Sequence, residues 1–100
     1  MEKKLEKLFE PIKINKMQVE NRICYAPTGK SHFTEDGYMT DQALCYYVAR
    51  AKGGTGLIIV EVCLPAAKYA RPVRKLLGCW DDSQLAGLKD LAEAVHAAGA

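Results

Sequence analysis

The sequence predicts an α/β fold in which strands of a parallel sheet alternate with helices. Residues 57–62 form an apolar, largely β-branched run without alternation, which is typical of a strand buried on both faces. Two amphipathic helical patterns follow two such strand patterns. The strand onsets at Ile23 and Leu57 lie 34 residues apart, close to the roughly 31 residues per unit of a (β/α)₈ barrel. We therefore expect an N-terminal hairpin followed by the first two βα units of a (β/α)₈ TIM barrel.

The first element expected is a β-hairpin within residues 8–22. Alternating residues at 12–14 and 17–19 flank the polar pair Asn15-Lys16, which suits a two-residue turn. Residues 22–26 form the next apolar run, and Pro27 stops it because proline cannot donate to a sheet ladder. The following loop, residues 28–39, is of a length that is uncommon without a function.

Both helices carry recognisable end signals. Thr40 is the expected N-cap of the first helix, and Gly53-Gly54 is its expected stop. A loop over residues 63–80 separates the second strand from the second helix, for which residues 81–83 provide capping chemistry and Gly99 provides the end. The second helix is expected to bury one apolar stripe, formed by Leu85, Leu88, Leu91, Ala92 and Val95.

The repeat period also bears on completeness. Two strands and two helices cannot close a barrel, and a third strand is due near residue 100, so we expect a part of a longer protein. The alternative is a complete small α/β domain in which the hairpin covers one sheet edge. Both possibilities predict parallel strands joined by a right-handed crossover.

Composition excludes several classes of function. The chain has 100 residues, 49% of them hydrophobic and 26% charged, and a net charge of +2, which does not favour nucleic-acid recognition. No apolar run approaches the roughly 18 residues of a membrane span, and the charged start is unlike a signal peptide. We expect a cytoplasmic protein.

The four cysteines lie 21, 18 and 16 residues apart without a Cys-x-x-Cys pair, so we expect buried, reduced thiols and no metal site.

Chemistry is expected at the carboxyl ends of the two strands, where ligands gather in parallel α/β folds. Thr28 and Gly29 suit hydrogen bonding to a flat cofactor with polar edges, although the glycine taken alone is better explained by a turn. Glu61, inside an apolar strand, needs a partner, and a structural ion pair is the favoured explanation. His32 and His96 are expected to be structural. The basic loop residues Lys68, Arg71, Arg74 and Lys75 could meet an anionic ligand group but are more typical of a solvated surface.

Several short motifs occur in one order along nearly the whole chain. They are Leu8-Phe9-Glu10-Pro11-Ile12, Asn21-Arg22-Ile23, Ala26-Pro27-Thr28, Asp36-Gly37, Tyr46-Tyr47-Val48-Ala49-Arg50-Ala51-Lys52-Gly53-Gly54, Gly56-Leu57-Ile58-Ile59-Val60-Glu61 and Trp80-Asp81-Asp82. In this order and spacing the chain resembles the Old Yellow Enzyme-like flavin oxidoreductases. The motifs Thr40-Asp41-Gln42, Tyr46-Tyr47 and Lys52-Gly53-Gly54 look most like the long branch that contains 2-enoate and 2,4-dienoyl-CoA reductases.

The resemblance implies that residues 1–100 are the N-terminal part of an FMN-binding TIM-barrel domain. Ala26, Pro27 and Thr28 would line the isoalloxazine through their backbone, Gly29 would sit near its pyrimidine side, and Val62 would contact the ring or its substituents. Glycine at position 29 excludes a covalent cysteinyl link to FMN there. No catalytic residue is expected within the chain, because the family's catalytic groups would lie beyond Ala100.

The resemblance also implies an activity, namely NAD(P)H-driven reduction of an activated C=C bond in an enone, enoate or enoyl-CoA. Long members carry a [4Fe–4S] cluster and FAD in addition to FMN. The full-length enzyme would form a homo-oligomer, and the 100-residue piece alone would be inactive. The alternatives are a flavin-dependent amine dehydrogenase or demethylase on the same scaffold, and a non-catalytic fragment without bound cofactor.

Overall fold

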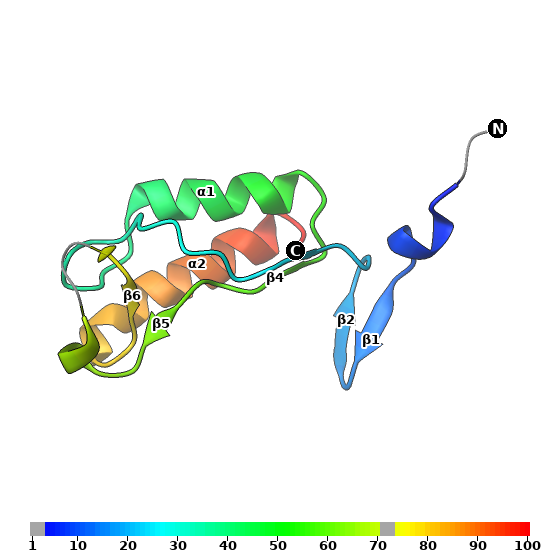
Figure 1. Ribbon diagram of the computed structural model, residues 1–100. Coiled ribbons are helices and arrows are strands. Elements are labelled where there is room, and N and C mark those ends of the chain that lie inside the picture. Colours follow the sequence, from blue (N-terminus) through cyan, green and yellow to red (C-terminus); the bar gives the residue numbers. More distant parts are fainter. Residues whose placement is uncertain (1–3, 71–73) are drawn as a thin grey trace.

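The computed structural model describes residues 4–70 and 74–100 (Figure 1). A short 3₁₀ helix, Glu6–Phe9, precedes the predicted hairpin of β1 (Ile12–Ile14) and β2 (Met17–Val19). The strands pair antiparallel, and Asn15 starts the turn at a φ of 55°, a conformation that asparagine tolerates. The hairpin projects from the layered body of the molecule in Figure 1.

The predicted parallel pair is present. Strand β3 (Cys24–Tyr25) lies beside β4 (Leu57–Ile58), with Cys24 opposite Leu57 and Tyr25 opposite Ile58. Both strands are shorter than the predicted 22–26 and 57–62. The next bond of this parallel ladder would need the amide of residue 27 to donate to the Ile59 carbonyl, and Pro27 has no amide hydrogen. Hydrogen bonding therefore stops one step after Tyr25, whose carbonyl accepts from the Ile59 amide at 3.1 Å.

The expectation that residues 57–62 are buried on both faces is wrong for this chain. Ile59 and Val62 retain 46% and 55% of their exposure, while Glu61 retains only 3%. Ile58 and Val60 pack against the hydrophobic core, whereas Ile59 and Val62 are exposed and no described element covers them. The described strands form three two-stranded sheets, so they do not close a barrel.

A second parallel pair occurs where the sequence predicted only a loop. Strand β5 (Cys63–Leu64) pairs with β6 (Leu77–Gly78), and a 3₁₀ turn, Ala67–Tyr69, lies between them. Of the basic residues predicted here, Arg71 lies outside the described residues. The ammonium of Lys68 lies 5.0 Å from the centroid of the Tyr69 ring.

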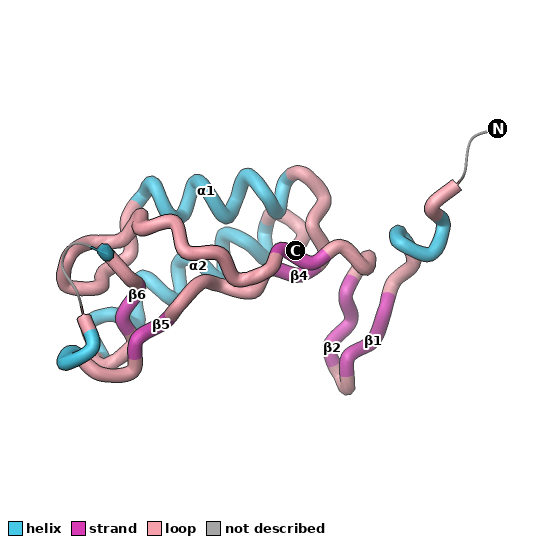
Figure 2. Tube along the Cα trace, in the orientation of Figure 1, coloured by secondary structure: helices cyan, strands magenta, loops and turns pink. Residues whose placement is uncertain are grey.

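The two predicted helices are present as α1 (Asp41–Lys52) and α2 (Leu85–Ala97), and they run side by side in Figure 2. The Thr40 hydroxyl caps α1 by accepting from the Ala43 amide at 3.1 Å. Asp81 and Gln84 form a capping box on the 3₁₀ turn Asp82–Gln84 that leads into α2. Local side-chain chemistry thus sets both helix starts, as predicted.

The hydrophobic core lies between the helices and the inner side of the extended segments. The predicted stripe of α2 is only partly confirmed, because Leu91 and Val95 are buried whereas Leu85 is 63% exposed and Ala92 is exposed. Leu77 of β6 enters the same cluster and is 2% exposed. The buried cluster consists of Phe33, Ala43, Tyr47, Ala51, Leu77, Leu91 and Val95.

The expectation of buried thiols is wrong. Cys24, Cys45, Cys63 and Cys79 are all free and exposed. On β3 the alternation of a strand turns Tyr25 toward α1, which leaves Cys24 on the open face.

Among the described residues there is no group of three or more potential metal ligands. No helix in the described part of the chain is long and apolar enough to cross a membrane.

Candidate functional site

The site is built where the chain leaves β3 and β4. Because the strands are parallel and in register, residues 26–30 and residues 59–63 emerge at the same edge. The parallel pairing thus confirms that the two strand ends are neighbours. Glu61 joins them directly, since its Oε2 accepts a hydrogen bond from the Lys30 amide at 2.5 Å.

The segment that follows β3 presents its backbone to solvent. Ala26, Pro27, Thr28 and Gly29 are all exposed. The Thr28 hydroxyl donates to the Ala26 carbonyl at 3.0 Å, a local hydrogen bond that restrains the Thr28 side chain. Within the described chain the amides of Thr28 and Gly29 have no hydrogen-bond partner. This segment therefore offers two free backbone amides, next to the apolar ring of Pro27.

The segment that follows β4 contributes apolar surface. Val62 is 55% exposed and Ile59 is 46% exposed, both on the side away from the helices. Thr28 and Gly29 supply hydrogen-bonding groups on the other segment. The two strand ends thus combine apolar side chains with free backbone donors, which is the composition of many small-molecule sites.

Glu61 is the charged residue at the centre of this arrangement. Its side chain is buried, with 3% exposure for the residue. Oε1 accepts from the Tyr47 hydroxyl at 3.1 Å, and that hydroxyl in turn accepts from the Glu61 amide at 3.3 Å. The predicted ion pair is absent in residues 4–70 and 74–100, where no cation lies within salt-bridge distance of Glu61. Neutral donors satisfy the carboxylate instead.

Tyr47 is held as a hydrogen-bond donor by its surroundings. Burial raises the pKa of Tyr47 to about 12, and the nearby Glu61 charge acts in the same direction, against a favourable bond from the Glu61 backbone. The phenol thus stays protonated over the whole physiological pH range. The residue is 1% exposed and belongs to the hydrophobic core, which positions its hydroxyl under the strand end.

A second polar cluster lies between β3 and α1. The hydroxyl groups of Tyr25 and Tyr46 share a hydrogen bond, and the Arg50 guanidinium stacks 3.7 Å from the centroid of the Tyr46 ring. That bond and the cations Arg50 and Lys30 lower the pKa of Tyr46, whereas the same bond raises the pKa of Tyr25. His32 packs edge-on against Tyr46, with ring centroids 5.4 Å apart.

Cys63 lies immediately after Val62. Although the residue as a whole is exposed, partial burial of its thiol is the main cause that raises its pKa to about 11, with a smaller contribution from Cys79. The Cys79 thiol donates to the Leu64 carbonyl at 3.3 Å. Cys63 is therefore almost entirely a protonated thiol near neutral pH and a poor nucleophile.

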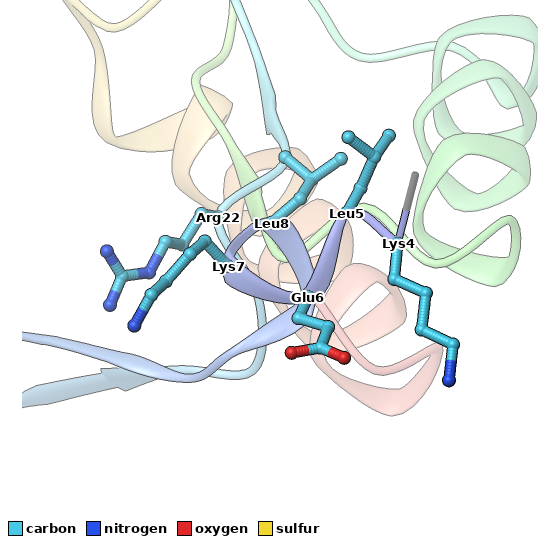
Figure 3. Close-up of a pocket in the computed structure, with 6 residues that line it drawn as sticks. All are labelled: Lys4, Leu5, Glu6, Lys7, Leu8 and Arg22. Carbon is cyan, nitrogen blue, oxygen red and sulfur yellow. The ribbon is translucent and has the colours of Figure 1, made fainter. Parts of the chain in front are cut away.

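A separate hollow lies elsewhere in the described chain. It measures about 610 Å³ and is lined by residues 4–8 and Arg22 (Figure 3). Lys7 and Arg22 both contact Glu10, at 3.4 Å and 3.8 Å, so both cations share one exposed carboxylate. The hollow lies against the N-terminal 3₁₀ helix, and none of residues 26–30 or 59–63 lines it. It does not contribute to the candidate site.

Comparison with known proteins identifies the family. The model of the NADH:flavin oxidoreductase / NADH oxidase family matches residues 7–100. The chain belongs to this family. Among related proteins, the NADH oxidase of Thermoanaerobacter brockii is 40% identical over 93% of this chain, and the NADPH dehydrogenase of Listeria welshimeri is 37% identical over 96%.

Solved structures agree with the family assignment. Old Yellow Enzyme from Pichia sp. AKU4542 superposes with a TM-score of 0.85 at 33% identity, over 94% of this chain and 24% of that chain. A 2-naphthoyl-CoA reductase, in complex with 2-naphthoyl-CoA, gives 0.82 at 32% identity, over 95% of this chain and 14% of that chain. The chain thus matches an N-terminal portion of the Old Yellow Enzyme barrel.

The family members that match are much longer than this chain. It spans 14% of the Thermoanaerobacter brockii NADH oxidase and 28% of the Listeria welshimeri NADPH dehydrogenase. A metal reductase from Desulforamulus reducens, 39% identical, is also matched over 14% of its length. The predicted resemblance to Old Yellow Enzyme-like proteins, including long members, is confirmed.

The contributions of Tyr47 and Lys30 to the site are not indicated by the sequence. Tyr47 has the helical spacing of a core residue, so its position in the sequence does not indicate a role for its hydroxyl. Lys30 contributes a backbone amide, a group that no side-chain pattern reveals. The available signal was Glu61, since a carboxylate inside an apolar strand requires donors nearby.

Proposed function

We propose that the complete polypeptide carrying this sequence is an FMN-dependent oxidoreductase that uses NAD(P)H to reduce an activated C=C bond. The observation that carries the proposal is the parallel register of β3 and β4, which brings exposed residues 26–29 and Val62 to one edge. Membership of a flavin oxidoreductase family supplies the cofactor class.

The residues at this edge fit a flavin by their chemistry. The isoalloxazine is planar, with an apolar ring and a pyrimidine edge that both donates and accepts hydrogen bonds. Ala26 and Pro27 offer a backbone surface for the ring, and Val62 offers an apolar side chain. The free amides of Thr28 and Gly29 offer donors for the polar edge.

The fit at Gly29 rests on chemistry and not on a steric requirement. A Cβ placed on Gly29 would lie 3.7 Å from Glu61 Oε2, which is ordinary van der Waals contact. Larger side chains at this position would project into the same edge. Following the resemblance to the family, we propose that Gly29 lies near the pyrimidine side, where its free amide can donate a hydrogen bond.

FMN, when bound, supplies the hydride chemistry that links a reduced nicotinamide to an electron-poor alkene. This chain contributes binding and orientation, because the described strand ends carry no general acid or activated nucleophile. The 2-naphthoyl-CoA bound by one structural relative favours thioester-activated substrates as one class to examine. We extend the proposal to residues 1–100 as the N-terminal part of an FMN-binding domain of a homo-oligomeric enzyme.

The test is flavin binding by the complete polypeptide. We expect the purified protein to show the visible absorption bands of oxidised flavin, to release FMN on denaturation, and to oxidise NAD(P)H faster when an enone or enoyl-CoA is added. A Thr28→Pro, Gly29→Pro double variant, which removes both free amides, should bind FMN more weakly. A complete polypeptide that is colourless and does not take up added FMN would contradict the proposal.

A further inference from the structure

A buried carboxylate without a cation is costly, so the position of Glu61 calls for a reason. Replacing such a residue with an apolar one of similar volume is often neutral for stability. Glu61 sits in an otherwise apolar run of residues 57–62 and is 3% exposed. If position 61 only filled space in the core, an apolar β-branched residue would pack there at a lower desolvation cost than Glu61.

The contacts of Glu61 point toward the segment after β3. One oxygen accepts from the Lys30 amide at 2.5 Å, and the same oxygen lies 3.7 Å from the place of a Cβ on Gly29. Just beyond this bond Ser31 adopts a φ of 58°, in the left-handed region of backbone conformation. The carboxylate is therefore the anchor that fixes residues 29 and 30 relative to β4.

The second oxygen is fixed from the opposite side. The Tyr47 hydroxyl donates to Oε1 at 3.1 Å and accepts from the Glu61 amide at 3.3 Å, so the side chain and backbone of Glu61 are locked to helix α1. Since both oxygens act as acceptors, the group has the hydrogen-bonding pattern of an ionised carboxylate. Both donors are neutral, so the negative charge is not cancelled.

We propose that Glu61 is a positioning residue for flavin, which holds the Gly29–Lys30 backbone in its binding conformation and whose charge makes the bound flavin harder to reduce. This inference rests on the proposed function, because it takes residues 26–29 as the flavin contact. Reduction adds negative charge near Gly29, and a fixed carboxylate on the protein side opposes that gain.

The magnitude follows from a single unit charge. Two unit charges about 10 Å apart at an effective dielectric constant of about 20 change an equilibrium by roughly tenfold. Removal of the Glu61 charge should therefore strengthen the binding of reduced flavin relative to oxidised flavin by about tenfold. For a two-electron couple that ratio corresponds to a rise of about 30 mV in midpoint potential.

The experiment compares three variants of the complete polypeptide. Glu61→Gln removes the charge at constant shape, and Tyr47→Phe removes one donor but keeps the charge. Glu93→Gln, on the exposed side of α2, removes an equal charge far from the strand ends along the chain and serves as the matched control. For each protein we would measure the Kd for FMN, the midpoint potential of bound FMN, and the urea midpoint of the flavin-free form.

We expect Glu61→Gln to raise the potential by about 30 mV and to weaken the binding of oxidised FMN. Tyr47→Phe should weaken FMN binding by about three- to tenfold, the equivalent of one hydrogen bond, with the potential unchanged. Glu93→Gln should match the wild type in all three measurements.

Other results would overturn the inference. If Glu61→Gln lowers only the urea midpoint, Glu61 is a structural residue and the inference fails while flavin binding stands. If Glu61→Gln does not fold, Tyr47→Phe decides, and a wild-type Kd for FMN in that variant overturns the inference. Failure of the wild-type protein to bind FMN would instead refute the proposed function.

Discussion

Three glycines in the connection from α1 to β4 should respond to alanine in three different ways. Gly56 is buried against the chain that enters β3, and a Cβ on it would lie 2.6 Å from Asn21 Oδ1 and 2.7 Å from the Asn21 carbonyl oxygen. The Asn21 side chain cannot move aside freely, because its amide donates to the Gly54 carbonyl at 2.7 Å and its oxygen accepts from the Ile23 amide at 2.9 Å. The Cβ would therefore push apart the segments that set the parallel register.

The expected magnitude comes from two opposing terms. An alanine in a compatible conformation lowers the entropy of the unfolded chain and stabilises a protein by about 0.4–1 kcal/mol. Overpacking against backbone costs about 1–3 kcal/mol. For Gly56→Ala we expect the second term to win and the free energy of unfolding to fall by about 1–2 kcal/mol.

The neighbouring glycines are internal controls. Gly53 has a φ of −72°, and a Cβ there would meet its nearest atoms at 3.4 Å, so Gly53→Ala should be neutral or slightly stabilising. Gly54 has a φ of 104° with open space around it, so Gly54→Ala should destabilise through backbone strain alone, by about 1 kcal/mol. Urea unfolding of the complete polypeptide, with all three variants measured together, ranks their free energies of unfolding. A Gly56→Ala variant as stable as Gly53→Ala would refute the close-approach argument.

Three further predictions concern stability and ionisation. Thr40→Ala should lower the free energy of unfolding by about 1 kcal/mol, because the Ala43 amide loses its cap, whereas Thr40→Ser should keep most of it; urea midpoints distinguish the two. Leu77→Ala should cost about 2–5 kcal/mol because Leu77 is 2% exposed, and Leu85→Ala, at a residue 63% exposed, should cost little; thermal unfolding of both variants checks this contrast. The raised pKa of Tyr47, about 12, means that its neutral form stabilises the fold fully below the ordinary phenol pKa of about 10 and that this contribution is lost as pH rises through about 12. An alkaline absorbance titration should therefore show a late tyrosine ionisation that is lost in Tyr47→Phe, whereas Tyr25, whose pKa is also raised, still ionises late in that variant.

The helix boundaries were predictable because their signals are local. A threonine hydroxyl reaches the amide three residues ahead at Thr40, and Asp81 and Gln84 form their box within four residues. Such contacts depend on neighbouring residues in the sequence and not on the rest of the fold. The hairpin turn at Asn15 was predictable for the same reason.

Strand length and burial were less predictable because they depend on partners distant in sequence. The apolar character of residues 57–62 indicates a strand with two covered faces, but Ile59 and Val62 have no described element across from them. The short pair of β5 and β6 lacks any sequence signal, since each strand has only two residues. A cysteine in a strand does not indicate which face is buried, because its small side chain suits both the buried and the exposed face.

The strand ends that form the candidate site could be predicted from the sequence, but the hydrogen bonds that hold them together could not. Residues that follow apolar runs predict the strand ends, so Thr28 and Val62 could be identified. The link between the two ends runs through a backbone amide at Lys30 and a core hydroxyl at Tyr47, and neither is visible as a motif. The only sign of this link in the sequence is a charged residue, Glu61, among apolar neighbours.

The proline at the end of β3 has an implication for how this region can diversify. Pro27 ends the ladder by its covalent structure, because it has no amide to offer the Ile59 carbonyl. The strand end is thus independent of the side chains that follow, and substitutions at Thr28 or Gly29 cannot extend β3 into the site. Variation at these two positions can alter ligand contacts while the scaffold stays in register, which would let one framework be adapted to many chemistries.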